Sequence, residues 1–186
     1  MRALLFALLL VPSAAFAGVS GPATVNDADT LNLNGEDISL YGIDALEITQ
    51  SCVVGDEDWF CGWDAANRLE DIIAGRDVTC TLATEATEET GALYRCMAGD
   101  DDLALMMLDE GLAVVTDDTD DLYREREAAA EEARTGMWAG SFLKPATFRA
   151  NDCGCTARKK AMQETAAMLR EKREAEEAAA AEAATN

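Results

Sequence analysis

The ten residues ISLYGIDALE, at positions 38–47, decide how the rest of the chain is interpreted. Apolar and small residues alternate along this stretch as in a half-buried β-strand, and the strand is expected to end in a turn that carries Asp44 and Glu47. Two carboxylates at the end of a strand are typical of a metal site or of a site that activates water. Basic side chains are scarce around them, because Arg68 is the first Lys or Arg after Arg2.

The N-terminus has the pattern of a secretory signal. Arg2 precedes an apolar run that extends to Pro12, and small residues at positions 15–17 predict cleavage before Gly18. We therefore expect a periplasmic or secreted protein. The run is shorter than the roughly 20 apolar residues that a membrane-spanning helix needs, so no membrane span is predicted.

The charge of the remaining chain is strongly negative. Without residues 1–17 it holds 14 basic and 36 acidic residues, a net charge of −22, and the excess lies in residues 18–155, with 8 basic and 30 acidic residues. Such a surface repels polyphosphates, which argues against nucleic acid as a partner. Two interpretations stay open: acidity for solubility, which we favour, or recognition of a basic partner.

Six cysteines and no histidine indicate an oxidising compartment, in which cysteines form disulfides. Six cysteines allow fifteen connectivities, so any pairing from sequence is a hypothesis. Cys80 and Cys96 lie on two apolar-alternating runs joined by a polar loop, so they could bridge adjacent antiparallel strands. Cys52 and Cys61 bracket an acidic loop before a helix, which they would fix in place.

Short strands and amphipathic helices follow one another along the chain. Strand patterns occupy residues 23–27, 30–34, 37–41, 77–82 and 92–97, and helical spacing occupies residues 59–74, 103–110 and 120–135. Asn34-Gly35 predicts a tight hairpin turn, and Asp56 or Asp58 is expected to cap the first helix, which Gly75 ends. Five short strands with about three packed helices predict an α+β fold built on a closed β-barrel of the oligonucleotide-binding kind. The side chains expected in its core are those of Trp59, Trp63, Leu69, Ile73, Leu105, Leu108 and Trp138.

Several ordered motifs resemble one family. The run ATVNDADTLNLNGEDISLYGIDALE, residues 23–47, is similar to the opening of the thermonuclease (staphylococcal nuclease-like) family, which has a V-x-D-G-D-T turn followed by R-L-x-G-I-D-A-P-E. Further matches are Cys52, the Cys61-Gly62 pair, and the segments at residues 74–76, 78–80, 111–113 and 136–142. The resemblance covers about residues 21–148. It implies a five-stranded barrel with three helices that hydrolyses DNA or RNA phosphodiesters with Ca²⁺.

The resemblance also assigns roles to single residues. Asp29 and Asp44 match the family's calcium ligands, and Glu47 matches the glutamate that positions the attacking water. The two catalytic arginines of the family are replaced, one by Ser39 and the other at or beside Gly91. A weak Ca²⁺ site at Asp29 and Asp44 is one interpretation, and ordinary turn aspartates are the other.

The missing arginines argue against catalysis. Attack on a phosphodiester places negative charge on the phosphate oxygens, which a forked guanidinium neutralises and a hydroxyl does not. Residues 77–94 contain no Lys or Arg that could substitute. We therefore expect a degenerate thermonuclease-like domain that binds a protein or a small ligand. The alternative is an active Ca²⁺-dependent nuclease that turns Arg68, Arg76 or Arg95 into the cleft.

The C-terminal part lies outside the resemblance. Cys153 and Cys155 could form a short disulfide, bridge to another chain or act as a redox element. Residues 156–182 are rich in Ala, Glu and Lys and predict a solvated helix. The expected organisation is a signal peptide at 1–17, the domain at 18–150 and this helical extension at 151–186. A third functional alternative is a structural envelope protein that associates through its C-terminal helix.

Overall fold

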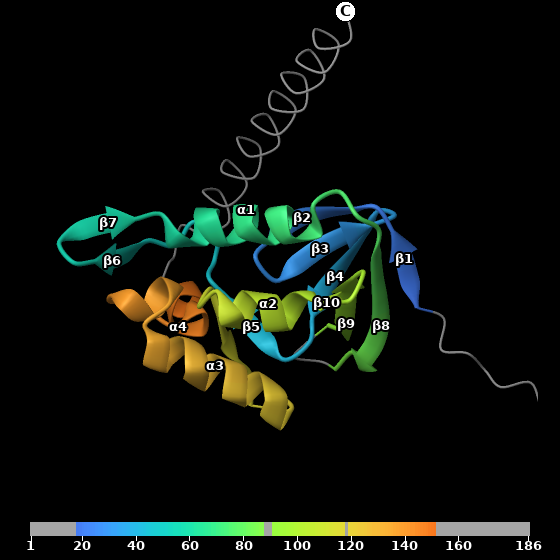
Figure 1. The fold of residues 1–186 in the computed structure, drawn as a ribbon. Helices are drawn as coiled ribbons and strands as arrows, with labels where there is room; N and C mark the ends of the chain where they lie inside the picture. Colours follow the sequence, from blue (N-terminus) through green and yellow to red (C-terminus); the bar gives the residue numbers. More distant parts are fainter. Residues whose placement is uncertain (1–17, 88–90, 118, 152–186) are drawn as a thin grey trace, which may run out of the picture.

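The computed structural model describes residues 18–87, 91–117 and 119–151 (Figure 1). The predicted signal peptide, Cys153, Cys155 and the C-terminal helical extension lie outside the described residues. The strands are β1 (Val19–Gly21), β2 (Ala23–Asp27), β3 (Thr30–Leu33), β4 (Glu36–Leu40), β5 (Ile43–Ala45), β6 (Cys52–Val54), β7 (Glu57–Trp59), β8 (Val78–Thr84), β9 (Leu93–Ala98), β10 (Asp101–Asp102) and β11 (Ala113–Val115). The helices are α1 (Cys61–Ile73), α2 (Leu103–Asp109), α3 (Asp121–Ala133), the 3₁₀-helix η1 (Gly136–Ala139) and α4 (Pro145–Asn151).

The main sheet is mixed, and its hydrogen-bonded order is β1-β8-β9-β4-β3-β2, with β10 added beside β9. Neighbouring strands are antiparallel except β4 and β9, which run parallel. Two shorter ladders stand apart from this path, one of β5 with β11 and one of β6 with β7. The predicted α+β class, with an architecture consistent with the oligonucleotide-binding kind of fold, is confirmed.

The alternation seen in the sequence places the sheet's apolar side chains in the core. Leu31 and Leu33 of β3 and Ile38 and Leu40 of β4 are buried, while Asn32 and Ser39 between them are more exposed. The two strands pair antiparallel across the predicted Asn34-Gly35 turn, where both residues have positive φ angles of 55° and 89°. The hairpin prediction is therefore confirmed.

The stretch ISLYGIDALE, residues 38–47, is not a single strand. β4 ends at Leu40, and β5 begins at Ile43 after a turn in which Gly42 has a φ of 83°. A side chain at Gly42 would also meet Thr119, since an added Cβ would lie 2.5 Å from its Oγ1. Asp44 consequently lies within a second, short strand and not in the turn that follows the first.

Helix α1 begins later than its apolar spacing suggests. Its N-cap is Phe60, so the predicted caps at Asp56 and Asp58 are wrong. The reason is that residues 52–54 pair with residues 57–59 as the β6–β7 hairpin, which turns at Gly55. The helix ends as expected, with Ala74 and Gly75 both in the left-handed region.

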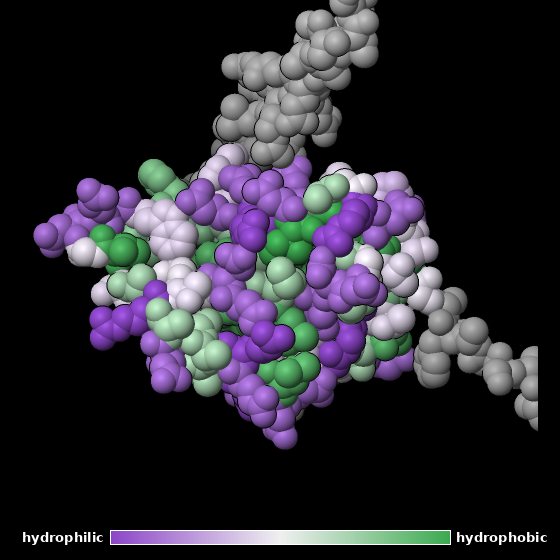
Figure 2. All heavy atoms as spheres, in the orientation of Figure 1, coloured by the Kyte–Doolittle hydropathy of each residue, from purple (hydrophilic) through white to green (hydrophobic). Residues whose placement is uncertain are grey.

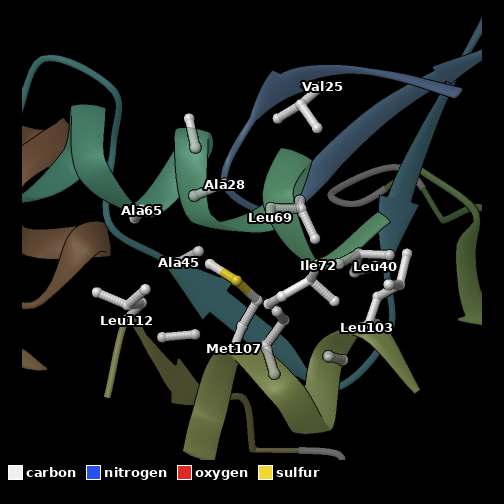
Figure 3. Close-up of a cluster of buried hydrophobic side chains, with 14 of the residues drawn as sticks. Val25, Ala28, Leu40, Ala45, Ala65, Leu69, Ile72, Leu103, Met107 and Leu112 are labelled. Carbon is white, nitrogen blue, oxygen red and sulfur yellow. The ribbon is translucent and has the colours of Figure 1, made fainter. Parts of the chain in front are cut away.

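The predicted core positions lie in or against one apolar cluster (Figure 3). Leu69 and Ile72 of α1 and Leu103 and Met107 of α2 point toward each other in the space between the two helices (Figure 3). Of the residues expected in the core, three are buried and four are partly buried against the cluster. The buried ones are Leu69, Ile73 and Leu108, and the others are Trp59, Trp63, Leu105 and Trp138.

Both predicted disulfides are present. Cys80 and Cys96 are directly opposite each other in the β8–β9 pair, which explains their bond. Cys52 and Cys61 join the first residue of β6 to the first residue of α1. These bonds fit a protein of an oxidising compartment. No described helix is both long and apolar enough to cross a membrane.

The sequence analysis expected about three packed helices and missed the fourth. Helix α4 contacts β5 and lies near the β6–β7 hairpin, at the end of the molecule opposite β1 (Figure 1). The chain reaches α4 through an isolated bridge in which Val53 and Ser141 exchange two backbone hydrogen bonds of 2.9 and 2.8 Å. This path brings the C-terminal end of the described chain to Asp44 and Glu47.

Candidate functional site

The three carboxylates singled out in the sequence come from neighbouring turns and strands. Asp44 stands opposite Val114 in the β5–β11 pair, and Glu47 follows two residues after β5. Asp29 lies in the turn between β2 and β3, and one of its oxygens, Oδ2, accepts a 3.0 Å hydrogen bond from the backbone N–H of Ala45. The structure therefore connects the β2–β3 turn to β5 directly.

Two aspartates of the β2–β3 turn hold the backbone around the site. Asp27 is buried, and its Oδ1 accepts from the N–H groups of Ala28 at 2.9 Å and Ile48 at 3.1 Å. Asp29 accepts a further bond of 3.0 Å from the Thr30 hydroxyl at Oδ1. Burial raises the pKa of Asp29 to about 6, and the Ala45 hydrogen bond opposes part of that rise. The bonds of Asp29 fit the interpretation of this residue as a turn aspartate, whereas Asp44 lies within β5.

The backbone of Glu47 is clamped by close contacts. Its carbonyl accepts a 2.7 Å bond from the Gln50 N–H, and its own N–H donates to Gln50 Oε1 at 3.3 Å. The carbonyl also lies against the start of α1, where a Cβ on Gly62 would stand 1.6 Å from the Glu47 oxygen. Only glycine fits at position 62, so the Cys61-Gly62 motif fixes Glu47 by packing.

A guanidinium from the far end of the domain lies on these carboxylates. Arg149 of α4 donates from Nη1 to Asp44 Oδ1 at 2.7 Å, from Nη2 to Asp44 Oδ2 at 3.2 Å, and from Nη1 to Glu47 Oε1 at 2.7 Å. The hydrogen bonds to Asp44 and Glu47 raise the pKa of Arg149, against the opposing effect of its partial burial. The contact with Asp44 is the forked geometry typical of strong arginine–carboxylate pairs.

The positions assigned to the family's catalytic arginines hold no charge. Ser39 lies in β4 with Thr30 and Leu93 as its neighbours across the sheet. Gly91 is exposed, and an added Cβ there would meet no atom within 4 Å. Neither position presents a cation to the carboxylates.

The arginines named as substitutes are paired elsewhere. Arg68 binds Glu110 at 2.6 Å, and Arg76 binds Asp101 at 2.9 Å and the Ala98 carbonyl at 2.7 Å. Their hydrogen bonds and ion pairs hold α1 to α2 and the end of α1 to the sheet. They therefore have structural roles away from Asp44 and Glu47.

Arg95 belongs to a second arginine–carboxylate cluster. Its guanidinium lies 5.0 Å from the Tyr41 ring centroid and 5.3 Å from that of Tyr123, and it pairs with Asp120 at 2.7 Å. The Tyr123 hydroxyl donates to Asp102 Oδ2 at 2.8 Å, and burial together with this bond raises the pKa of Tyr123. This cluster joins α3 to β9 and the start of α2.

A hollow of about 390 Å³ opens between α1, the end of α2 and η1, and its lining does not include the three carboxylates. Arg68 and Glu110 pair beside it, and Trp59 donates from Nε1 to Asp64 at 2.5 Å. On the face shown in Figure 2 hydrophilic residues predominate and apolar residues form separate patches. The hollow and the carboxylates are thus separate features of a largely polar surface.

The fold and the carboxylate arrangement define a small α+β domain of the thermonuclease type. A family model described as staphylococcal nuclease homologue matches residues 37–140. The chain belongs to this family. It is also 32% identical, over 144 residues and 73% of each chain, to the succinoglycan biosynthesis protein ExoI of Rhizobium meliloti (strain 1021).

Arg149 is the residue at the candidate site that the sequence analysis missed. It is one residue beyond the stretch in which the family resemblance is recognised, and 105 and 102 residues separate it from Asp44 and Glu47. The observation that only eight basic residues occur among residues 18–155 gave the one usable signal. A short list of cations could have been tested against the two carboxylates, but nothing in the local pattern selects Arg149.

Proposed function

We propose that this chain is an exported thermonuclease-like protein whose domain no longer hydrolyses phosphodiesters and acts as a binding or interaction module. The observation that carries the proposal is the charge of the site. Ser39 and Gly91 stand where the family resemblance expects arginines, and the guanidinium that does reach Glu47 and Asp44 is bound to both of them.

Phosphodiester hydrolysis needs positive charge directed at the phosphate. A comparable arginine in other phosphoryl-transfer enzymes contributes roughly 10³ to 10⁵ in rate. Arg149 donates its Nη1 and Nη2 hydrogens to carboxylates, so these donors do not point at a substrate oxygen. Most of the other described guanidinium groups are also paired with carboxylates, which leaves a surface that repels a polyanionic substrate.

We infer the biological process in which this chain binds its partner from the similar protein ExoI. Its name assigns it to succinoglycan biosynthesis. We carry over to this chain a role in glycan biosynthesis outside the cytoplasm, because both disulfides fit an oxidising compartment. On this proposal the bound partner is a protein or a small ligand of that process, and nucleic acid is not a substrate.

The test is digestion of single-stranded DNA with Ca²⁺ by purified protein lacking residues 1–17. We expect no turnover above that of Glu47→Gln, because the transition-state charge would not be neutralised. Arg126→Gln is a matched control, since Arg126 pairs with Asp109 on the exposed surface away from the site. Turnover that Glu47→Gln abolishes and Arg126→Gln preserves would overturn the proposal.

An active nuclease is the second candidate, and Arg149 is the observation that favours it. In that case the guanidinium would leave Asp44 and turn to the phosphate, and α4 would supply the charge that β4 lacks. Arg149→Lys separates the two candidates in the same assay. An active enzyme would lose at least about 10²-fold in kcat, since lysine lacks the forked donors, whereas an inactive domain would show no change.

A further inference from the structure

The two carboxylates of the site are engaged by one cation that belongs to the chain itself. Arg149 Nη1 lies 2.7 Å from both Asp44 Oδ1 and Glu47 Oε1, and Nη2 reaches Asp44 Oδ2 at 3.2 Å. The carboxylate side chains are only 18% and 11% exposed, while that of Arg149 is 46% exposed. The guanidinium therefore covers the side of the site that faces solvent.

Several further contacts deliver α4 to this place. The backbone of Ser141 pairs with Val53, and the buried Gln50 side chain donates from Nε2 to the Leu143 carbonyl at 2.6 Å. Gly140 allows this approach, because a Cβ there would stand 1.9 Å from the Val53 oxygen. Gln50 also holds the Glu47 turn, so the same side chain positions the carboxylate and the segment that carries its arginine.

With Arg149 in place, the arrangement does not fit the calcium ion that the family implies. Calcium takes six to eight oxygen ligands at about 2.3–2.6 Å. Within the part of the chain that the structure describes, no group of three or more acidic, Cys or His side chains is arranged to hold a metal. Both oxygens of Asp44 accept from Arg149, and both oxygens of Asp29 accept from Thr30 and Ala45.

We propose that Arg149 is the built-in cation of this site, and that docking of α4 and binding of a divalent cation at Asp44 and Glu47 exclude each other. A guanidinium within hydrogen-bonding distance occupies the carboxylate oxygens, and a second cation beside it would be repelled. Because Arg149 is tethered, its effective concentration at the site is in the millimolar range or above, which a weakly bound ion does not overcome. The site thus takes a guanidinium in place of a metal.

This inference deepens the proposed function and shares its premise that the site carries out no metal-dependent hydrolysis. The measurement concerns cation binding and not turnover, so its result can contradict this inference without contradicting the proposed function. Ca²⁺ binding is measured by isothermal titration calorimetry on the full chain without residues 1–17, at low ionic strength. The variants are Asp44→Asn, Arg149→Gln and the double variant, with Arg126→Gln as the control for loss of an arginine from the surface.

We expect Arg149→Gln to gain one Ca²⁺ site that is at least about 10-fold tighter than any in the wild type, because the two carboxylates lose their counter-charge. The added Asp44→Asn change should remove that site, and Arg126→Gln should bind Ca²⁺ as the wild type does. Failure of Arg149→Gln to gain a site that depends on Asp44 would overturn the inference.

A second comparison, between the wild type and Asp44→Asn, leaves Arg149 unchanged. Asp44→Asn should leave Ca²⁺ binding unchanged, since Asp44 is already occupied by the guanidinium. A stoichiometric Ca²⁺ site in the wild type that Asp44→Asn removes would also overturn the inference. Circular dichroism on each variant verifies that the fold is retained.

Discussion

Two arginines in this domain each bind a pair of carboxylates, but they do so in different surroundings. Arg95 lies between the rings of Tyr41 and Tyr123 and pairs with Asp120. Arg149 lies at the end of the described chain and joins two carboxylates that the family resemblance places at the catalytic centre. The first arginine packs against two tyrosine rings, and the second is placed over two carboxylates by a helix near the end of the described chain.

The partners of the two arginines explain the difference. In the Arg95 cluster, Asp102 also caps α2 by accepting from the N–H groups of Ala104 and Leu105, and Tyr123 is fully buried. Each group therefore has a structural task beyond the ion pair. In the Arg149 cluster, Asp44 lies within β5, Glu47 follows that strand, and the arginine places positive charge beside both carboxylates. Similar ion pairs thus join α3 to β9 and the start of α2 in one region and neutralise two carboxylates in the other.

The largest effect is expected from Tyr123→Ala. This change removes a fully buried ring and the hydroxyl that joins Arg95 to Asp102, so the free energy of unfolding should fall by about 4 kcal/mol. Denaturant unfolding measures the loss. Leu122→Ala on the same helix removes a side chain that is 48% exposed, and it should stay within about 0.5 kcal/mol of the wild type. Equal losses would show that the cluster is not what holds α3.

A smaller loss is expected from Arg149→Gln. Its carboxylate partners are mostly buried but the arginine is half exposed, so the free energy of unfolding should fall by about 1–2 kcal/mol, between the values for exposed and buried pairs. Arg126→Gln breaks an exposed pair with Asp109 and should cost less than about 0.5 kcal/mol. If Arg149→Gln and Arg126→Gln lowered the free energy of unfolding by the same amount, the Arg149 ion pairs would be no stronger than an ordinary exposed pair. Raising the salt concentration should narrow the gap between them.

A third effect depends on pH and concerns Asp29. Its folded pKa of about 6 lies above the ordinary 3.8, so the folded state binds this proton more tightly than the unfolded chain does. The contribution of Asp29 to stability is therefore present below about pH 4 and is lost as the pH rises toward 6. Asp29→Asn does not titrate and should gain about 2 kcal/mol relative to the wild type between pH 4 and pH 7, measured by denaturant unfolding at each pH. A difference that shrinks with rising pH would contradict the assigned shift.

Patterns of short range explain which parts of the fold were predictable. The alternation in β3 and β4, the Asn34-Gly35 turn and the placement of Cys80 opposite Cys96 all follow from two-residue periodicity and turn chemistry. The start of α1 was misplaced because the apolar spacing continues back into β7, and pairing within a hairpin outweighs helical periodicity there. The closing strands β5 and β11 are three residues each and leave little pattern of their own.

In the candidate site, too, the residues of a local sequence motif were predictable and the residue distant in sequence was not. Asp29, Asp44, Glu47 and the replaced position Ser39 belong to one continuous motif, so the resemblance could assign them. The second replaced position, at or beside Gly91, was assigned from the loop between two predicted strands. Arg149 comes from a seven-residue helix whose place is set by a bridge to Val53 and a bond from Gln50. Contacts of this kind depend on the path of the folded chain, so the spacing of apolar residues in the sequence does not predict them.

The long separation between the two halves of the site affects how a new chain is made. Asp44 and Glu47 leave the ribosome 105 and 102 residues before Arg149. At about 5–20 residues per second, this delay is roughly 5–20 s. Throughout that interval the growing chain carries two adjacent negative side chains without their arginine, open to metal ions or helper proteins. Completion of α4, the last helix among the described residues, then ends that exposure, so the order of synthesis makes this ion pair a late step in the folding of the described domain.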